Sequence, residues 1–206
     1  MKKIISIIVC VLMLSALSGC SKKTDDSAYE MMTAEANNGN YDAALEYYHK
    51  GGADSGSEDV VDWYFYSMAM SDFESDGCIG YSYDLLANKC NSSFGKAKSK
   101  ASEIKALVED FDGAYNCGMT YLYIFDGKIA VNNGSHLTGT VYCAEEIVLR
   151  EDTYYWARHT VDGEDTLLYT LTLTDTGITV TAVDEANNMY AGEYLPDNCE
   201  MPQLIF

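Results

Sequence analysis

Apolar positions recur at two different spacings along this chain, and the change falls close to residue 113. Between residues 29 and 112 they return every three or four residues, as on one face of an α-helix. The clearest run is 94–111, in which one face is apolar and lysines occupy the other. The apolar positions of that run are Phe94, Ala97, Ala101, Ile104, Val108 and Phe111.

Local signals predict where the earlier helices begin and end. Ser27 and Glu30 form a capping box, in which each side chain satisfies an exposed backbone amide, and the helix that they open ends at residues 37–39. Asn40 is expected to cap a second helix, which ends at residues 51–52, two glycines. Further helices are expected over residues 57–73 and 81–88.

After residue 113 the apolar spacing becomes two, which is typical of β-strands. The Asp126-Gly127 pair lies between two such runs, 119–125 and 128–131, and predicts a hairpin with a type I′ turn. Four more turns separate strands expected over residues 140–150, 153–160, 166–174, 178–183 and 189–194. In the 166–174 strand, one face is expected to hold Leu167, Tyr169, Leu171 and Leu173.

Consecutive antiparallel strands form a meander, which can close into a small barrel and so remove its exposed edges. No helix separates these strands, so a parallel sheet is not expected. The sequence predicts an α+β fold, with a helical region over 29–112 and an antiparallel meander or small barrel of about seven strands over 113–206.

The amino-terminal segment has the composition of a signal peptide. Lys2 and Lys3 precede an apolar stretch, residues 4–17, and small residues follow at 18 and 19. The stretch is too short for a transmembrane helix, which needs about 20 apolar residues. An ordinary secretory signal with a cysteine nearby by chance is the alternative interpretation.

The four residues 17–20, Leu-Ser-Gly-Cys, resemble the lipobox of bacterial lipoproteins. The resemblance implies that residues 1–19 are removed, that the Cys20 thiol carries a diacylglyceryl group, and that the new amino terminus receives a further chain such as palmitate. Residues 20–28 would then be the lipidated cysteine and its tether. The expected location is the extracytoplasmic face of the cell membrane or the outer envelope.

The net charge of −19 limits the partners. An acidic surface repels nucleic acid and anionic lipid headgroups, so no nucleic-acid partner is expected, and contact with the membrane is expected only through acyl chains on Cys20. The same acidity also favours solubility, which is the simpler explanation for it.

Cys78, Cys90, Cys117, Cys143 and Cys199 remain once Cys10 leaves with the signal and Cys20 is lipidated. An extracytoplasmic compartment permits disulfides. Cys78 and Cys90 would close a helical hairpin, and Cys117 could pair with Cys143 or with Cys199. The connectivity stays open. No cysteine lies at zinc-finger spacing from a histidine, so neither a metal site nor a cofactor is expected.

An acidic segment between two expected helices partly matches an EF-hand loop. Asp72, Glu74 and Asp76 stand at its first, third and fifth positions, and a glycine follows at the sixth. Tyr83 occupies the twelfth position, where a bidentate glutamate should complete the coordination. The sequence therefore favours an ordinary acidic turn over a calcium site.

Patterns of catalytic residues are missing: there is no HExxH, no G-x-S-x-G and no P-loop. Glu145 and Glu146 are neighbours on an expected strand and should point to opposite faces, so they cannot flank a glycosidic bond together. We therefore expect a protein that is not an enzyme. Aromatic residues gather in the expected strands, either as core or as a platform for a ligand, and these are Tyr121, Tyr123, Tyr154, Trp156 and Tyr169.

Residues 38–48 resemble the second half of a tetratricopeptide repeat, which implies a helical hairpin in which Gly39 makes the turn and Ala44 allows close helix contact. Residues 111–195 are similar to lipocalin-like small β domains and to uncharacterised bacterial lipoproteins. Two functional hypotheses follow. The first is a non-catalytic binding module at the cell envelope that recognises a protein, a glycan or a small ligand through its β unit. The second is an assembly factor whose repeat-like helices hold a protein partner.

Overall fold

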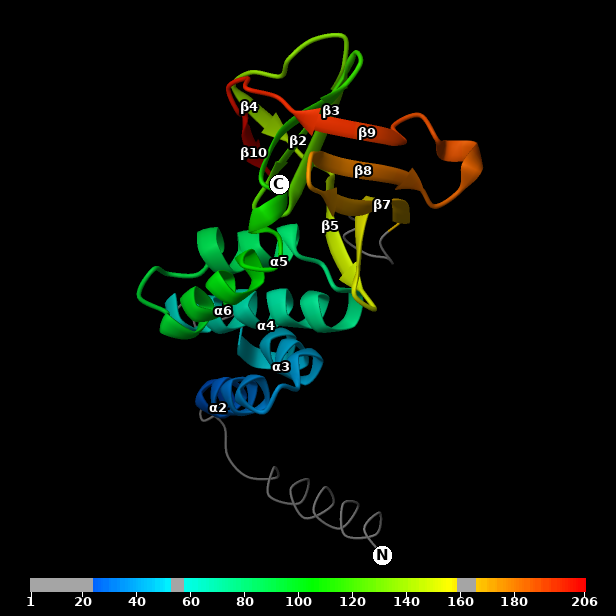
Figure 1. Ribbon diagram of the computed structural model, residues 1–206. Helices are drawn as coiled ribbons and strands as arrows, with labels where there is room; N and C mark the ends of the chain where they lie inside the picture. The colour runs from blue at the N-terminus through cyan, green and yellow to red at the C-terminus, as the bar shows by residue number, and fades with distance from the viewer. Residues whose placement is uncertain (1–23, 53–57, 159–165) are drawn as a thin grey trace, which may run out of the picture.

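The computed structural model describes residues 24–52, 58–158 and 166–206, and its elements lie in successive layers (Figure 1). The α-helices come first along the chain. They are α2 (Thr24–Asn37), α3 (Tyr41–Tyr47), α4 (Glu58–Asp76), α5 (Gly80–Asp84) and α6 (Gly95–Lys105). Short turns of π-helix, η1 (Tyr48–Gly52) and η3 (Leu85–Lys89), extend α3 and α5, and a 3₁₀ turn, η4 (Glu109–Phe111), follows α6.

Eight of the described strands form a closed antiparallel barrel in the order β1-β2-β3-β5-β6-β7-β8-β9. Their bounds are β1 (Gly113–Cys117), β2 (Thr120–Phe125), β3 (Lys128–Asn133), β5 (Glu145–Arg150), β6 (Thr153–Arg158), β7 (Thr166–Thr174), β8 (Gly177–Ala182) and β9 (Gly192–Pro196). The 3₁₀ turn η5 (Glu185–Asn187) lies between β8 and β9. The prediction of helices followed by an antiparallel meander that closes into a barrel is thus confirmed, with eight strands where about seven were expected.

The segment expected as one strand over 140–150 is divided. β4 (Thr140–Tyr142) leaves the barrel and pairs in parallel with β10 (Gln203–Ile205), a strand that was not predicted. Cys143 donates its backbone N–H to the carbonyl of Ile205, 2.7 Å away, and β5 starts two residues later. The expectation of purely antiparallel pairing is wrong for this small sheet, because residues 197–202, which follow β9, bring β10 beside β4.

The predicted helix over 94–111 is interrupted after Lys105. The hydroxyl of Tyr154, on β6, donates to the carbonyl of Leu107 at 2.8 Å, which the break in the helix leaves available. The break also lets the ring of Phe111 pack 4.9 Å from that of Tyr154, measured between centroids. Packing against the barrel therefore overrides the helical period at this point.

The other helix boundaries follow the sequence closely. α2 ends at Asn37 as predicted, but it begins before Ser27, so the expected capping box does not mark its start. Asn40 precedes α3 as predicted, yet its side-chain amide donates to Glu35 at 2.7 Å and caps no backbone amide of α3. No helix in the described ranges combines the length and apolarity that a membrane span requires.

One apolar core joins the helices to the barrel. It contains Ile79 and Ile104 from the helical part together with Ile124 and Ile147 from the strands. The interior of the barrel is filled by side chains, including those of Trp156 and Tyr194. Barrels of eight strands have room for a packed interior or for one small ligand, and this one is packed. A second cluster joins α2, α3 and α4, and contains Met32, Ala36, Ala44 and Val60.

The chain between α4 and α5 is built into the barrel wall. The N–H of Leu149 donates to Gly77 at 2.9 Å, and the N–H of Ile79 donates to Ile147 at 3.1 Å. These bonds continue the hydrogen bonding along the edge of β5 beyond the residues that pair with the start of β3. Gly77 has φ of +75°, and a β-carbon there would lie 2.1 Å from the carbonyl oxygen of Leu149. Only glycine fits this approach of the helical layer to the barrel.

Candidate functional site

The five aromatic residues expected as a platform do not share one surface. Tyr154, Trp156 and Tyr169 face the barrel interior and belong to, or pack on, the main core. Tyr121 and Tyr123 lie on the other face of β2, in a cluster covered by the C-terminal segment. Neighbouring strand residues point to opposite faces, and the register of β2 and β6 assigns the two groups to opposite sides of the wall.

Within the barrel, Trp156 is held by specific contacts. Its ring Nε1 donates to the Glu145 carboxylate at 2.7 Å, and its ring stacks on that of Tyr190 with centroids 5.6 Å apart. Arg158 forms an ion pair with the same carboxylate at 3.1 Å. Trp156 is therefore part of the core at this end of the barrel.

Asp72, Glu74 and Asp76 lie within α4, so the acidic turn expected there is helix up to Asp76. Residues two apart on a helix point in different directions, and the three carboxylates do not converge on one ion. Asp76 accepts hydrogen bonds from Arg150 through its backbone oxygen at 3.0 Å and its carboxylate at 3.5 Å. Glu74 instead faces a hollow between helices.

The five cysteines of the folded part are all free thiols. Cys78 packs with Val148 and Ala157 outside the barrel wall, whereas Cys90 belongs to the main core and donates weakly to the carbonyl of Asp62 at 3.6 Å. The expected Cys78–Cys90 bridge is therefore not formed. Cys20, the expected lipidation site, lies outside the described residues.

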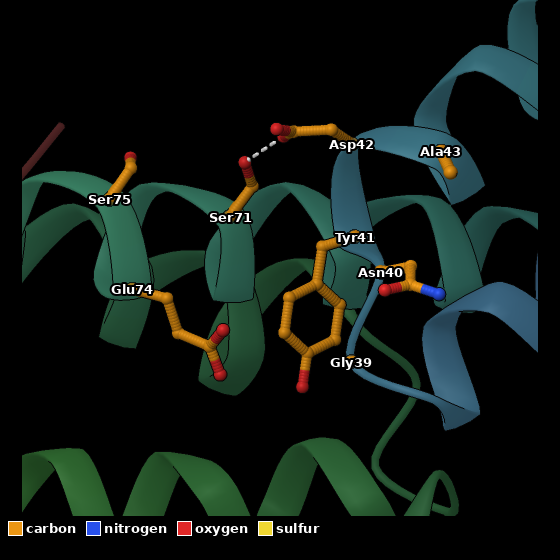
Figure 2. A pocket seen from close by; sticks show the side chains of 8 residues that line it. All are labelled: Gly39, Asn40, Tyr41, Asp42, Ala43, Ser71, Glu74 and Ser75. Carbon is orange, nitrogen blue, oxygen red and sulfur yellow. Dashed lines mark hydrogen bonds between the residues drawn. The ribbon is translucent and has the colours of Figure 1, made fainter. Parts of the chain in front are cut away.

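The hollow that Glu74 faces lies between α3 and α4 and has a volume of about 500 Å³. It is lined by Gly39, Asn40, Tyr41, Asp42, Ala43, Ser71, Glu74 and Ser75. Figure 2 shows Asp42 and Ser71 pointing toward one another across it, and their side chains hydrogen bond at 2.5 Å. Ser71, Glu74 and Ser75 share one face of α4, because helix residues three and four apart are neighbours.

The side chains that line this hollow are rich in hydrogen-bond acceptors, and the Lys100 ammonium interacts electrostatically with Tyr41 and Glu74 at its edge. Asp42 and Glu74 supply two carboxylates, and three hydroxyls come from Tyr41, Ser71 and Ser75. Beneath it, burial together with the neighbouring Tyr41 raises the pKa of Tyr66 well above its ordinary value, so that phenol stays neutral. Such a wall favours a ligand that brings positive charge or several hydroxyl donors.

Sequence analysis did not single out this hollow as a site. Asp42 and Ser71 come from different helices, and the repeat-like segment indicated only that α3 begins after Gly39. A signal existed in the spacing of Ser71, Glu74 and Ser75, which places three polar side chains on one face of α4. Their partner on α3 could be assigned only from the packing of the helices.

A second group of polar residues, buried or half-buried, lies where the helices meet the barrel. Lys128 on β3 pairs with Asp84 on α5, and Lys105 on α6 pairs with Asp126 in the β2–β3 turn at 2.5 Å. Asp112 accepts the backbone N–H of Asp126 at 2.8 Å, and burial raises the pKa of its carboxyl to about 6. These pairs fasten the two parts of the fold together, and Asp84, Asp126 and Lys128 also line a pocket of about 410 Å³ beside the C-terminal segment.

Comparisons with models of known protein families, with curated proteins and with solved structures found no match for this chain. The fold and the hollow define an α+β protein in which a helical layer with a polar, acidic hollow rests on a closed and filled antiparallel barrel.

Proposed function

We propose that this protein is a non-catalytic binding module of the bacterial cell envelope, anchored by lipid on Cys20. The lipobox-like residues 17–20 and the lysines before the apolar stretch support the anchor. The net charge of −19 also supports it, because so acidic a surface does not adsorb to anionic lipid by itself. Two or three acyl chains supply the durable attachment that a single chain does not.

The observation that carries the binding role is the α3–α4 hollow of about 500 Å³, which combines two carboxylates with three hydroxyls. Its size lies within the usual range of small-ligand sites, roughly 300–1,000 Å³. The barrel interior, by contrast, is filled by Trp156, Tyr194 and their neighbours. The recognition surface proposed here is therefore helical, and its ligand carries an amine or guanidinium group that the carboxylates of Asp42 and Glu74 accept.

A second candidate function is an assembly factor that holds a protein partner through its repeat-like helices. One observation favours it: the hollow opens beside residues 38–48, the segment that resembles half a tetratricopeptide repeat. Tyr41 from that segment packs edge-on against Tyr66, with centroids 6.1 Å apart, as a groove-filling aromatic residue would. The cationic group would then be a lysine or arginine side chain of the partner.

Metabolic labelling tests the anchor. Cells that express the full chain are grown with labelled palmitate, and the label is followed into this protein. We expect wild type and Cys10→Ala to be labelled and Cys20→Ala to lose the label. Cys10 is the matched control because it lies in the segment that is removed. Label that persists in Cys20→Ala, or its absence from wild type, would contradict the anchoring proposal.

Peptide titration tests the hollow independently. The full chain in detergent is titrated with a short arginine-rich peptide and with the same peptide carrying neutral citrulline. We expect the arginine peptide to bind more tightly, and Asp42→Asn and Glu74→Gln each to weaken it by up to about fivefold, as loss of an exposed charge pair does. Glu193→Gln, an exposed barrel residue with the same charge change, is the control. Equal weakening in all three variants would show only nonspecific attraction and would overturn the assignment.

A further inference from the structure

Three side chains with different donor atoms meet beside the barrel, far from the α3–α4 hollow in the fold. His136 lies in the loop between β3 and β4, and Asp197 and Cys199 lie in the segment between β9 and β10. Their nearest donor atoms, a ring nitrogen, a carboxylate oxygen and a thiol sulfur, all lie within 4.8 Å of one another. His136 is exposed and the other two are half-buried, so the cluster is open to an entering ion.

The surrounding residues hold these side chains in place. The Tyr123 hydroxyl lies 3.3 Å from Nδ1 of His136 and accepts the backbone N–H of Leu137 at 3.0 Å. The ring of Tyr121 packs 4.2 Å from that of His136, measured between centroids. Tyr123 is itself fully buried, so His136 contacts a well-packed part of the barrel wall.

Asp197 is fixed in the same way from the other side. The amide of Asn116 on β1 donates to its Oδ2 at 3.0 Å, and its backbone N–H donates to the carbonyl of Ala114 at 2.7 Å. One of its carboxylate oxygens lies within the cluster. Hydrogen bonds that orient a ligand in this way support metal ligands in proteins.

We infer that His136, Asp197 and Cys199 bind a zinc ion. Thiolate and imidazole are poor ligands for calcium and magnesium, which take oxygen, whereas nitrogen, oxygen and sulfur together suit zinc in tetrahedral geometry. Carboxylate and thiolate balance the charge of the ion. The three residues supply three positions and leave the fourth to water.

Binding would join two loops that belong to different parts of the chain. The loop with His136 leads into β4, and the segment with Asp197 and Cys199 leads into β10, the parallel partner of β4. A shared ion would therefore fasten the segments that lead into β4 and β10 to one another beside the barrel. Sequence spacing gave no indication of this site because its ligands come from two distant loops.

Metal titration of the full chain, purified in detergent with its thiols reduced and traces of metal removed, tests the inference. We expect one equivalent of Zn²⁺ to bind and to raise the unfolding temperature, since a ligand that binds only the native state stabilises it. Co²⁺ in its place should give the near-ultraviolet thiolate charge-transfer absorption of a cobalt–sulfur bond.

Single substitutions test which residues bind the metal ion. Cys199→Ser should abolish the cobalt–sulfur absorption, and His136→Ala and Asp197→Asn should each weaken zinc binding by at least the roughly 10–100-fold that loss of a supporting residue costs. His49→Ala and Cys117→Ser are the controls and should bind as wild type does. Circular dichroism and the metal-free unfolding temperature check that each variant is folded.

Two results would overturn the inference. One is a reduced wild-type protein that binds no stoichiometric zinc. The other is a folded Cys199→Ser protein that keeps the cobalt–sulfur absorption, since the sulfur would then come from another cysteine. Neither result bears on the peptide titration of the α3–α4 hollow, whose residues lie in the helical layer.

Discussion

The Nζ atom of Lys128 lies 3.6 Å from Oδ1 of Asp84, and both side chains are almost completely buried. The pair joins β3 to α5. The rings of Tyr83 and Phe206 lie 5.5 and 5.7 Å from the same ammonium group, so its hydrophobic surroundings include the C-terminal segment. A buried pair of this kind stabilises only while both partners are present, because a single buried charge is costly.

Asp84→Ala should therefore lower the free energy of unfolding by about 3 kcal/mol or more, because it leaves Lys128 buried without its counter-ion. The measurement is urea unfolding at neutral pH. Glu46→Ala, which removes the exposed partner of Lys50, is the control and should change stability by less than about 1 kcal/mol. Equal effects of the two substitutions would show that the Lys128–Asp84 pair has no special role.

The carboxyl of Asp112 makes the free energy of unfolding depend on pH. Burial raises the pKa of its carboxyl from 3.8 to about 6. The native protein therefore holds this proton more tightly than the unfolded chain does, and stability falls as the pH rises from about 4 through about 6. Asp112→Asn keeps an acceptor for the N–H of Asp126 but does not titrate.

Asp112→Asn should accordingly gain stability over wild type as the pH rises through this range, and the two proteins should be closest near pH 4. Urea unfolding of both proteins at several pH values measures the difference. The comparison cancels the titration of the other acidic residues. A difference that is constant with pH would contradict the raised pKa of Asp112.

Alanine substitutions at Gly77 and at Gly118 distinguish the cost of a steric clash from the cost of backbone strain. Both have positive φ, +75° and +64°, but a β-carbon at Gly77 would meet the Leu149 carbonyl, whereas at Gly118 it meets nothing within 4 Å. Gly118→Ala should cost about 1–2 kcal/mol, the strain alone. Gly77→Ala should cost more than about 4 kcal/mol because the α4–α5 connection must leave β5. Thermal unfolding compares the two variants. Similar midpoints would mean that β5 shifts at little cost to accommodate the added β-carbon.

Burial raises the pKa of the Cys90 thiol to about 12. At pH 8 the native protein should hold on the order of a thousandfold less of its reactive thiolate than an ordinary cysteine does. Iodoacetamide should therefore modify Cys90 far more slowly in the native protein than in urea, as measured by mass spectrometry of the peptide that contains it. Equally fast modification in both conditions would indicate that the region around Cys90 opens readily.

Much of the fold was predictable because it is encoded locally. Asp126 and Gly127 have φ of +51° and +76°, the two positive values that the predicted hairpin turn requires. Alternation in β7 correctly assigned Tyr169 and Leu171 to the interior. It failed at Leu167, which packs outside with Ala157, because a bulge between Trp156 and Ala157 shifts the register and reverses the faces.

The parts that were missed depend on contacts between distant segments. The pairing of β4 with β10, the hydrogen bonds of Gly77 and Ile79 to β5, and the meeting of Asp42 with Ser71 all join residues that no local pattern relates. The five aromatic residues expected as a platform lie on two different sides of the barrel wall for a similar reason. Their chemistry was evident from the sequence, but the side of the wall that each one faces follows from the barrel register.

The order of the layers has a geometric consequence. α2, the described element closest to Cys20 in the chain, lies on the side of the helices that faces away from the barrel (Figure 1). A molecule tethered through that end would carry its helices as a pedestal and present the loop between β3 and β4, above β9, as its outermost part (Figure 1). The height of the pedestal would then set how far from the bilayer that loop can reach.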